Sequence, residues 1–299
     1  MSHLTNPLAT AAQLARCRDR SAALPLPSEL LDAVFFAMQR LTQAAGLLLE
    51  LPQSTTARAN VLLARYWVQA PGFDIDEFRA IDYRHVSAAA VYLVAKTGPI
   101  PRSARDVANV YHYLAVSGAD NDSLSNRSSD TEYAAFHTHV LACETRLLDA
   151  LAFETHVALP HPLAITYLQA LSFLGDMGPP AESQLAHRAM QYLNTALLSP
   201  QLLYITHQPH ELAVAAFYNA ARDIGARLPD ASGPWWEVFD VDRETLGFLA
   251  VALRSVSSWA AAAQEQQIAP SLFGSIGGGL TKTTVFRQAR RLEERAEGQ

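Results

Sequence analysis

The sequence predicts an all-α protein made of two tandem helical bundles. Between Val86 and Ala95 every residue except Ser87 is apolar, which is typical of a helix that is buried on all sides. The segment Ala89 to Lys96 lines up with a second one, Ala215 to Arg222, and both are small-residue helices that end in a cation. No stretch shows the alternation of a half-buried strand. Two bundles of roughly 110–130 residues would each have an ordinary domain size.

The composition indicates a folded globular chain. Of its 299 residues, 49% are apolar and 17% are charged. The net charge of −6 argues against a nucleic-acid binder that relies on a basic surface. Its two cysteines, Cys17 and Cys143, fit a reducing compartment without a disulfide framework. We expect no signal peptide at the start, and we interpret Leu246 to Ala263 as a core helix and not a membrane span.

The first predicted elements precede the buried helix. A short helix is possible from Thr10 to Ser21, before prolines at positions 25 and 27 mark a boundary. From Ser28 an amphipathic helix carries apolar residues at helical spacing, namely Leu31, Val34, Phe35, Met38 and Leu41. Ser54 is a plausible N-cap of the next helix, which ends before Pro71.

The central helix and its successors complete the first bundle. Lys96 suits the C-terminus of the central helix, and Gly98-Pro99 then stops it. Pro101 begins another helix, with an apolar face formed by Val107, Val110, Tyr111 and Leu114. Residues 117–131 read as an exposed loop because they are rich in Ser, Asp, Asn and Gly. A fifth helix is predicted from about Tyr133 to Leu151.

The second half repeats this plan. Helical patterns flank the repeated segment at 185–198, 235–239 and 246–259. After Pro270, residues 274–279 read as a flexible glycine linker, and 281–297 as a solvated helix or a disordered tail. The predicted organisation is therefore an N-terminal extension (1–27), a first bundle (28–157), a second bundle (158–269) and a flexible or helical tail (270–299).

No set of residues indicates catalysis. The chain has no phosphate-binding Gly loop followed by Lys-Ser/Thr, no Gly-x-Ser-x-Gly and no His-Glu-x-x-His. Residues two apart on a helix do not share a face, so His137 and His139 do not predict a metal site. Asp120 and Asp122 lack the spacing of a Ca²⁺ loop. We therefore expect neither enzymatic activity nor a cofactor or metal.

Lys96 and Glu144 form the most informative polar pair. Glu144 lies on the predicted apolar stripe of the fifth helix, where a carboxylate needs a cation or several donors nearby. Lys96 is a candidate partner at the end of the buried helix. The residues alone leave two interpretations open: a binding site, or an internal ion pair that only ends a helix.

Three stretches together resemble a known family. They are Ala-Ala-Ala-Val-Tyr-Leu-Val-Ala-Lys at 88–96 followed by 101–112, Thr-Gln-Ala-Ala-Gly-Leu-Leu-Leu-Glu-Leu-Pro-Gln at 42–53, and Leu-Leu-Asp-Ala-Leu-Ala-Phe-Glu at 147–154 with Pro160-His161-Pro162 after it. In this order they resemble cyclins over roughly residues 30–265, especially the transcription-associated cyclins of the L type. The resemblance implies two tandem five-helix cyclin boxes.

The resemblance also implies a function. Cyclins are regulatory, non-catalytic subunits that bind and activate a cyclin-dependent kinase as a heterodimer, here in transcription or RNA processing in the nucleus. Lys96 and Glu144 match the cyclin positions that bind the kinase's regulatory helix region. Leu93, Leu148 and Phe153 match apolar contacts of the same surface. Where cyclins commonly continue with an apolar residue and two acids, this chain has Thr97-Gly98-Pro99.

Two other functional classes fit the sequence less well. A general transcription factor of the tandem-cyclin type would bind promoter DNA, and should have a basic face and usually an N-terminal zinc ribbon. This chain is acidic and has only Cys17 near its start. A helical enzyme would need convergent acids or histidines on buried faces. We therefore expect a kinase partner, no direct contact with nucleic acid and no membrane association. The Met-Arg-Ala-Ile-Leu patch of cell-cycle cyclins is absent, so no substrate-docking site is expected.

Overall fold

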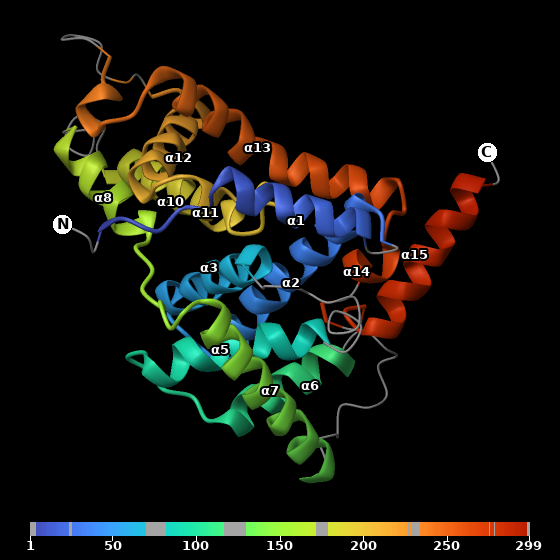
Figure 1. Ribbon diagram of the computed structural model, residues 1–299. Coiled ribbons are helices and arrows are strands. Elements are labelled where there is room, and N and C mark those ends of the chain that lie inside the picture. The colour runs from blue at the N-terminus through green and yellow to red at the C-terminus, as the bar shows by residue number, and fades with distance from the viewer. Residues whose placement is uncertain are drawn as a thin grey trace. The chain divides into compact units, whose positions relative to one another are not determined.

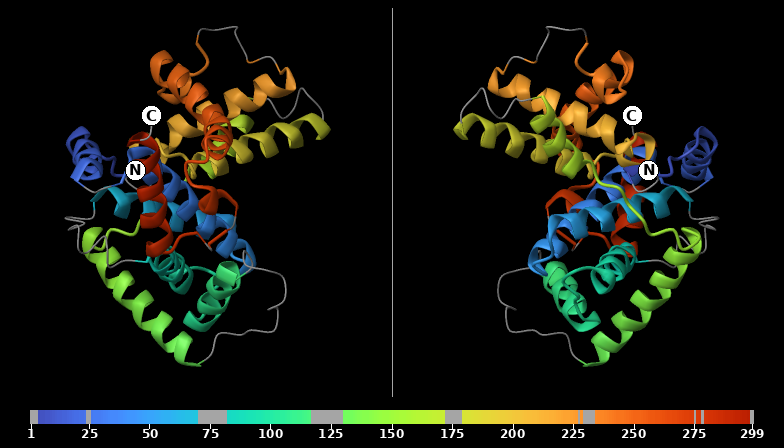
Figure 2. Two further views of the ribbon diagram at one scale, coloured as in Figure 1. Left: turned by 90° about the vertical axis from the view of Figure 1, so that its right-hand side faces the viewer. Right: turned by 90° about the vertical axis from the view of Figure 1, so that its left-hand side faces the viewer.

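The computed structural model describes a helical protein (Figures 1 and 2). The residues it describes are 4–23, 26–69, 82–116, 130–171, 179–226, 228, 234–274, 276–277 and 279–297. Within these ranges there is no strand, so the predicted all-α class is confirmed. The predicted loop at 117–131 falls almost wholly outside the described residues.

The chain divides into two compact units. We call residues 9–155 with 261–299 the N-terminal bundle, and residues 4–8 with 156–260 the C-terminal bundle. The predicted extension and tail are thus grouped largely with the N-terminal bundle. Its helices are α1 (Ala11–Ala23), α2 (Ser28–Leu48), α3 (Gln53–Gln69), α5 (Tyr83–Thr97), α6 (Ala104–Val116), α7 (Asp130–Ala150), α14 (Pro270–Gly274) and α15 (Lys282–Glu297).

Helix α5 is the centre of the N-terminal bundle. It packs against α2, α3, α6 and α7, and its residues 86–95 are buried apart from Tyr92. The polar exception predicted from sequence, Ser87, has partners on two neighbouring helices. Its hydroxyl lies 2.8 Å from Thr42 Oγ1 and 2.7 Å from Tyr111 Oη. The core therefore accepts this hydroxyl because it is hydrogen-bonded on both sides.

Helices α2 and α3 are held together by close packing and by amides. A Cβ at Gly46 would lie 2.2 Å from Oγ1 of the buried Thr56, so only glycine fits where these helices meet. The buried side chains of Gln39 and Asn60 each donate to the other residue's backbone carbonyl, both at 3.1 Å. These contacts fix the register of α2 against α3.

The tail from Pro270 contains two described helices, α14 and α15. Val285 and Ala289 are buried on one face of α15, and the Gln288 amide donates to the carbonyl of Ile268 at 2.9 Å. The linker glycines differ in packing: a Cβ at Gly274 would meet nothing within 4 Å, whereas a Cβ at Gly279 would lie 2.3 Å from the Ser271 carbonyl oxygen. The interpretation of this segment as a flexible linker is therefore wrong for Gly279, whose small size permits a close backbone approach.

The C-terminal bundle has its own central helix. Its elements are α8 (Pro160–Ala170), α10 (Pro179–Ala196), α11 (Leu203–Thr206), α12 (Pro209–Ile224), η2 (Glu237–Phe239) and α13 (Arg243–Glu265), whose last residues belong to the other unit. Helix α12 packs against α8, α10, α11 and η2, and Phe217 at its centre is fully buried. The Asn219 amide donates to the α13 carbonyl of Ala250 at 2.9 Å. The side chain of Asn6 pairs with the backbone of Ala158, so the chain's start belongs to this bundle.

The internal repeat recurs in three dimensions. In α5 the ammonium of Lys96 lies 5.3 Å from the ring centroid of Tyr92, one helical turn earlier. In α12 the guanidinium of Arg222 lies 5.7 Å from the ring of Tyr218, at the aligned positions. Each central helix thus ends in the same cation–aromatic contact.

Helix α13 is long and apolar enough to cross a membrane by length and composition alone. Of its most apolar 18-residue window, 39% is buried inside the protein. Leu246, Leu249, Leu253 and Val256 are buried along one face, as a core helix requires. Such a helix in isolation is weak support for a membrane span, and the expectation of no membrane association stays a prediction.

Candidate partner-binding surface around Lys96 and Glu144

The C-terminus of α5 presents Lys96 at the surface. The helix begins at an Asp82 N-cap, whose side chain accepts a hydrogen bond from the backbone amide of Arg84 at 2.9 Å. It ends at Thr97, two residues after the buried Ala95, so the Lys96 cation lies in the last turn, where it interacts favourably with the helix dipole. The Lys96 side chain is 38% exposed.

Glu144 lies on the inward face of α7, among Val140, Cys143 and Leu147, all of which are buried. Its carboxylate forms an ion pair with the Lys96 ammonium, as the sequence predicted. The two partners differ in exposure, because the Glu144 side chain is only 8% exposed. The ion pair is therefore partly exposed at its cation and buried at its carboxylate.

The buried carboxylate depends on that one cation. Glu144 Oε1 lies against the Lys96 ammonium, has no other hydrogen-bond partner among the described residues, and is shielded from solvent. Taking a carboxylate out of water without compensation is costly, so the Lys96 ammonium is its main stabilising contact among the described residues. A carboxylate in this state retains hydrogen-bonding capacity that an incoming donor could use.

Two of the three predicted apolar residues flank the ion pair. Leu93 lies one turn before Lys96 and is 6% exposed. Leu148 lies one turn after Glu144 and is half-buried. Residues three or four apart share a helix face, so these side chains border the pair along α5 and α7.

Phe153 is placed by an unusual backbone. Ala152 and Phe153 both have positive φ, 47° and 61°, and the Phe153 amide donates to the Leu148 carbonyl at 2.9 Å. Left-handed residues other than glycine cost roughly 1–2 kcal/mol each. The turn after α7 leaves the Phe153 ring 71% exposed. An exposed aromatic ring on a strained turn is therefore a candidate contact residue.

The segment Thr97-Gly98-Pro99, which departs from the cyclin pattern, follows Lys96 directly. The Thr97 hydroxyl donates back to the Leu93 carbonyl at 3.1 Å, and Gly98 caps the helix with extended backbone. Pro99 is exposed. The local chain is thus neutral, without the acids that cyclins commonly carry here.

Sequence reasoning missed three exposed apolar residues at the same end of the bundle. Leu47 and Leu48, at the end of α2, are 79% and 46% exposed, and Ile100 is 40% exposed. Arg102 donates to the carbonyl of Leu49 at 2.6 Å, which ties the α5–α6 connection to this corner. The helical pattern of α2 places Leu47 beyond its buried stripe, which was the available signal.

Arg65 of α3 was also missed. It is 4% exposed, and burial lowers the pKa of its guanidinium, while the nearby Glu154 carboxylate partly counters this effect. Glu154 directly follows Phe153, so the buried Arg65 cation lies near the left-handed turn formed by Ala152 and Phe153. An Arg in an otherwise apolar helix was the available sequence signal.

The described residues contain no cluster of three or more potential metal ligands. His137 and His139 point to different neighbours, since His137 packs on Tyr133 and His139 stacks on His85 with ring centroids 4.8 Å apart. Burial lowers the pKa of His85 to about 4, which keeps its ring neutral at physiological pH. The surface offers charge, apolar area and a rigid frame for binding.

Known proteins provide close comparisons. The chain is 32% identical over 206 residues to mouse Cyclin-L2, which is 69% of this chain and 37% of that protein. It is 31% identical to human Cyclin-L1 over 223 residues, 75% of this chain and 39% of that protein. A Caenorhabditis elegans cyclin L homologue, cyl-1, is 29% identical over 234 residues, 74% of this chain and 45% of that protein. The chain thus spans less than half the length of these relatives.

Solved structures share the fold. A chain of the yeast RNA Pol II CTD kinase CTDK-1 complex matches with a TM-score of 0.64 and 15% identity, covering 98% of this chain and 84% of that one. A chain of the CAK complex of Chaetomium thermophilum bound to ATP-γ-S matches with a TM-score of 0.58 and 19% identity, covering 96% and 86%. No family model matches. From its fold and its relatives, the chain belongs to the cyclin family, with L-type cyclins among its relatives.

Proposed function

We propose that the protein is a regulatory subunit that binds and activates a cyclin-dependent kinase acting in transcription or RNA processing. The observation that carries the proposal is the buried Glu144 carboxylate, whose cation, Lys96, lies at a surface that also bears the exposed Phe153 ring. Its relatives are named as L-type cyclins, and the structures that share its fold come from kinase complexes, which agrees with such a role.

The surface suits a helix of a partner kinase. An apolar side chain on that helix would cover Phe153 and Leu148, and a backbone or side-chain donor could reach the Glu144 carboxylate. Hot spots of interfaces are commonly aromatic and surrounded by residues that exclude water. Burial by the partner would also strengthen the Lys96–Glu144 attraction, because the local dielectric constant would fall.

Activation would follow from a shift in population. A free kinase of this class holds its regulatory helix and activation loop in unproductive positions. A rigid surface that binds only the productive arrangement must supply roughly 5.5 kcal/mol of differential binding to move the equilibrium from about 1:99 to 99:1. A signalling interface of about 2,000 Å² or more could provide this. The chain would contribute no acid, base or metal ligand to phosphoryl transfer, which depends on groups within the kinase.

We expect this role to be exercised in the nucleus. We also expect no direct contact with nucleic acid, because the net charge of the chain is −6. Affinity purification of the tagged full chain from its source cell tests the proposal. A protein kinase should co-purify in stoichiometric amount, and its activity should rise when purified chain is added. Robust kinase, hydrolase or transferase activity of the isolated chain would refute the proposal. Repeated purification without a co-purifying kinase would refute it as well.

A further inference from the structure

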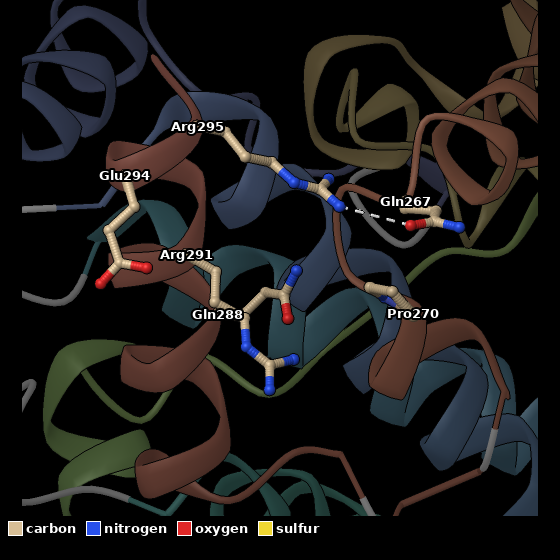
Figure 3. Close-up of a pocket in the computed structure, with 6 residues that line it drawn as sticks. All are labelled: Gln267, Pro270, Gln288, Arg291, Glu294 and Arg295. Atoms are coloured by element: carbon tan, nitrogen blue, oxygen red, sulfur yellow. Dashed lines mark hydrogen bonds between the residues drawn. The ribbon is translucent and has the colours of Figure 1, made fainter. Parts of the chain in front are cut away.

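A pocket of about 370 Å³ lies in the N-terminal bundle, well separated in sequence from the surface around Lys96. It is lined by Gln267, Pro270, Gln288, Arg291, Glu294 and Arg295. Four of these residues lie on α15 at helical spacing, Gln267 lies in the turn between α13 and α14, and Pro270 is the first residue of α14 (Figure 3). The pocket lining thus combines two guanidinium groups with two amides and one carboxylate.

The frame of the pocket is held in place. Gln288 is 7% exposed, and its amide nitrogen donates to the Ile268 carbonyl at 2.9 Å. Gln267 has a positive φ of 53°, in the turn where the amide of Ile268 bonds back to the carbonyl of Ala263. A left-handed glutamine is uncommon, and here the turn brings the Gln267 side chain to the pocket.

The two arginines are not neutralised. Arg295 donates to Gln267 Oε1 at a long 3.4 Å, and Arg291 has no hydrogen bond or ion pair among the described residues. Figure 3 shows the Arg295 guanidinium directed toward Gln267 and the Arg291 guanidinium on the other side of the Gln288 amide, whereas the Glu294 carboxylate points away. Both arginines are exposed, so their charges are hydrated in the free protein and are available to an incoming anion.

The ligand chemistry follows from these groups. Guanidinium groups bind tetrahedral oxyanions through paired N–H donors, and an amide adds a further donor. A phosphate monoester carries a charge near −2 and three acceptor oxygens, which match two cations better than a single carboxylate does. The pocket has room for one such group and lacks the run of cations that tracks a nucleic-acid backbone.

We propose that this pocket binds a phosphoserine or phosphothreonine side chain of a peptide, between Arg291 and Arg295. The protein would then have two binding surfaces, one for the kinase and one for a phosphorylated segment. This second proposal does not depend on the first, because phosphopeptide binding is measured with the chain alone.

Calorimetric titration of the full chain tests the proposal. The probes are the peptide Ac-Ala-Ala-phosphoserine-Ala-Ala-amide, its serine and glutamate counterparts, inorganic phosphate and a ten-nucleotide RNA. The phosphopeptide should bind at least tenfold more tightly than either counterpart peptide. Its affinity should fall below pH 6, where the phosphate gains a proton.

Matched variants assign the binding to the pocket. The double variant Arg291→Gln/Arg295→Gln should weaken phosphopeptide binding at least tenfold. Arg287→Gln/Arg290→Gln removes the same charge from exposed positions of α15 outside the pocket and should have less than a threefold effect. Equal losses of phosphopeptide affinity in both double variants would overturn the assignment. So would a glutamate peptide that binds as tightly as the phosphopeptide, or an RNA that binds more tightly. Binding of inorganic phosphate without binding of the phosphopeptide would also overturn it.

Discussion

Removing Lys96 should destabilise the protein more than removing Glu144, although both changes break the same ion pair. Lys96→Ala leaves a carboxylate that is 8% exposed and has no other hydrogen bond at Oε1. Leaving a buried polar group unsatisfied costs about 1–3 kcal/mol. Glu144→Ala leaves an ammonium that is already 38% exposed and can be hydrated, so its loss should be about 0–1 kcal/mol.

Differential scanning calorimetry of the single and double variants measures the asymmetry. One kcal/mol corresponds to a shift in Tm of roughly 2–4 °C for domains of 150–250 residues. Lys96→Ala should therefore lower the Tm by several degrees, and Glu144→Ala by about 2 °C or less. Glu144→Gln in the Lys96→Ala background should restore most of the loss, because a neutral amide replaces the stranded charge.

The result that refutes this reasoning is equally specific. If Lys96→Ala leaves the Tm unchanged, the carboxylate is hydrated and the pair is an ordinary surface contact. If Glu144→Ala is the more damaging variant, the Glu144 side chain supports the core in some other way. Either outcome would remove the energetic basis for treating Glu144 as a carboxylate that a partner can use.

Three further predictions concern the N-terminal bundle. Gly46→Ala should lower the free energy of unfolding in urea by about 1–3 kcal/mol, because the added Cβ would clash with Thr56. The control Gly247→Ala, in open space on α13, should be neutral or slightly stabilising. Ala90→Leu should overpack the centre of α5 at a similar cost of about 1–3 kcal/mol, and an unchanged Tm would contradict the burial. Since folding lowers the pKa of His85 to about 4 from an ordinary 6.5, the free energy of unfolding should fall as pH drops from 6.5 to 4, and His85→Phe should flatten that slope.

Much of the helical framework could be predicted from sequence because the spacing of apolar residues reports directly on burial. The uninterrupted apolar run of α5 and its repeat in α12 located both central helices. The proximity of Lys96 and Glu144 was also predicted, since a carboxylate on an apolar stripe requires a cation. The role of these two residues in binding stays a prediction.

Other features depended on tertiary packing that no local pattern contains. The unequal exposure of Lys96 and Glu144 is decided by how α7 lies against α5. The exposure of Phe153 follows from a left-handed turn that its sequence does not favour, because neither Ala152 nor Phe153 is a usual left-handed residue. Gly279 was read as flexible, since glycine gives the same signal whether it permits mobility or close approach.

Binding of the co-purified kinase to Phe153→Ala tests the central claim most directly. The side chain is 71% exposed, so its loss should leave folding unchanged. Val238→Ala, at a 76% exposed apolar position of the C-terminal bundle, is the matched control. Calorimetric titration should show at least tenfold weaker kinase binding for Phe153→Ala and unchanged binding for Val238→Ala. Unchanged affinity for Phe153→Ala, or an equal loss in both, would contradict a kinase-binding surface around Lys96, Glu144 and Phe153.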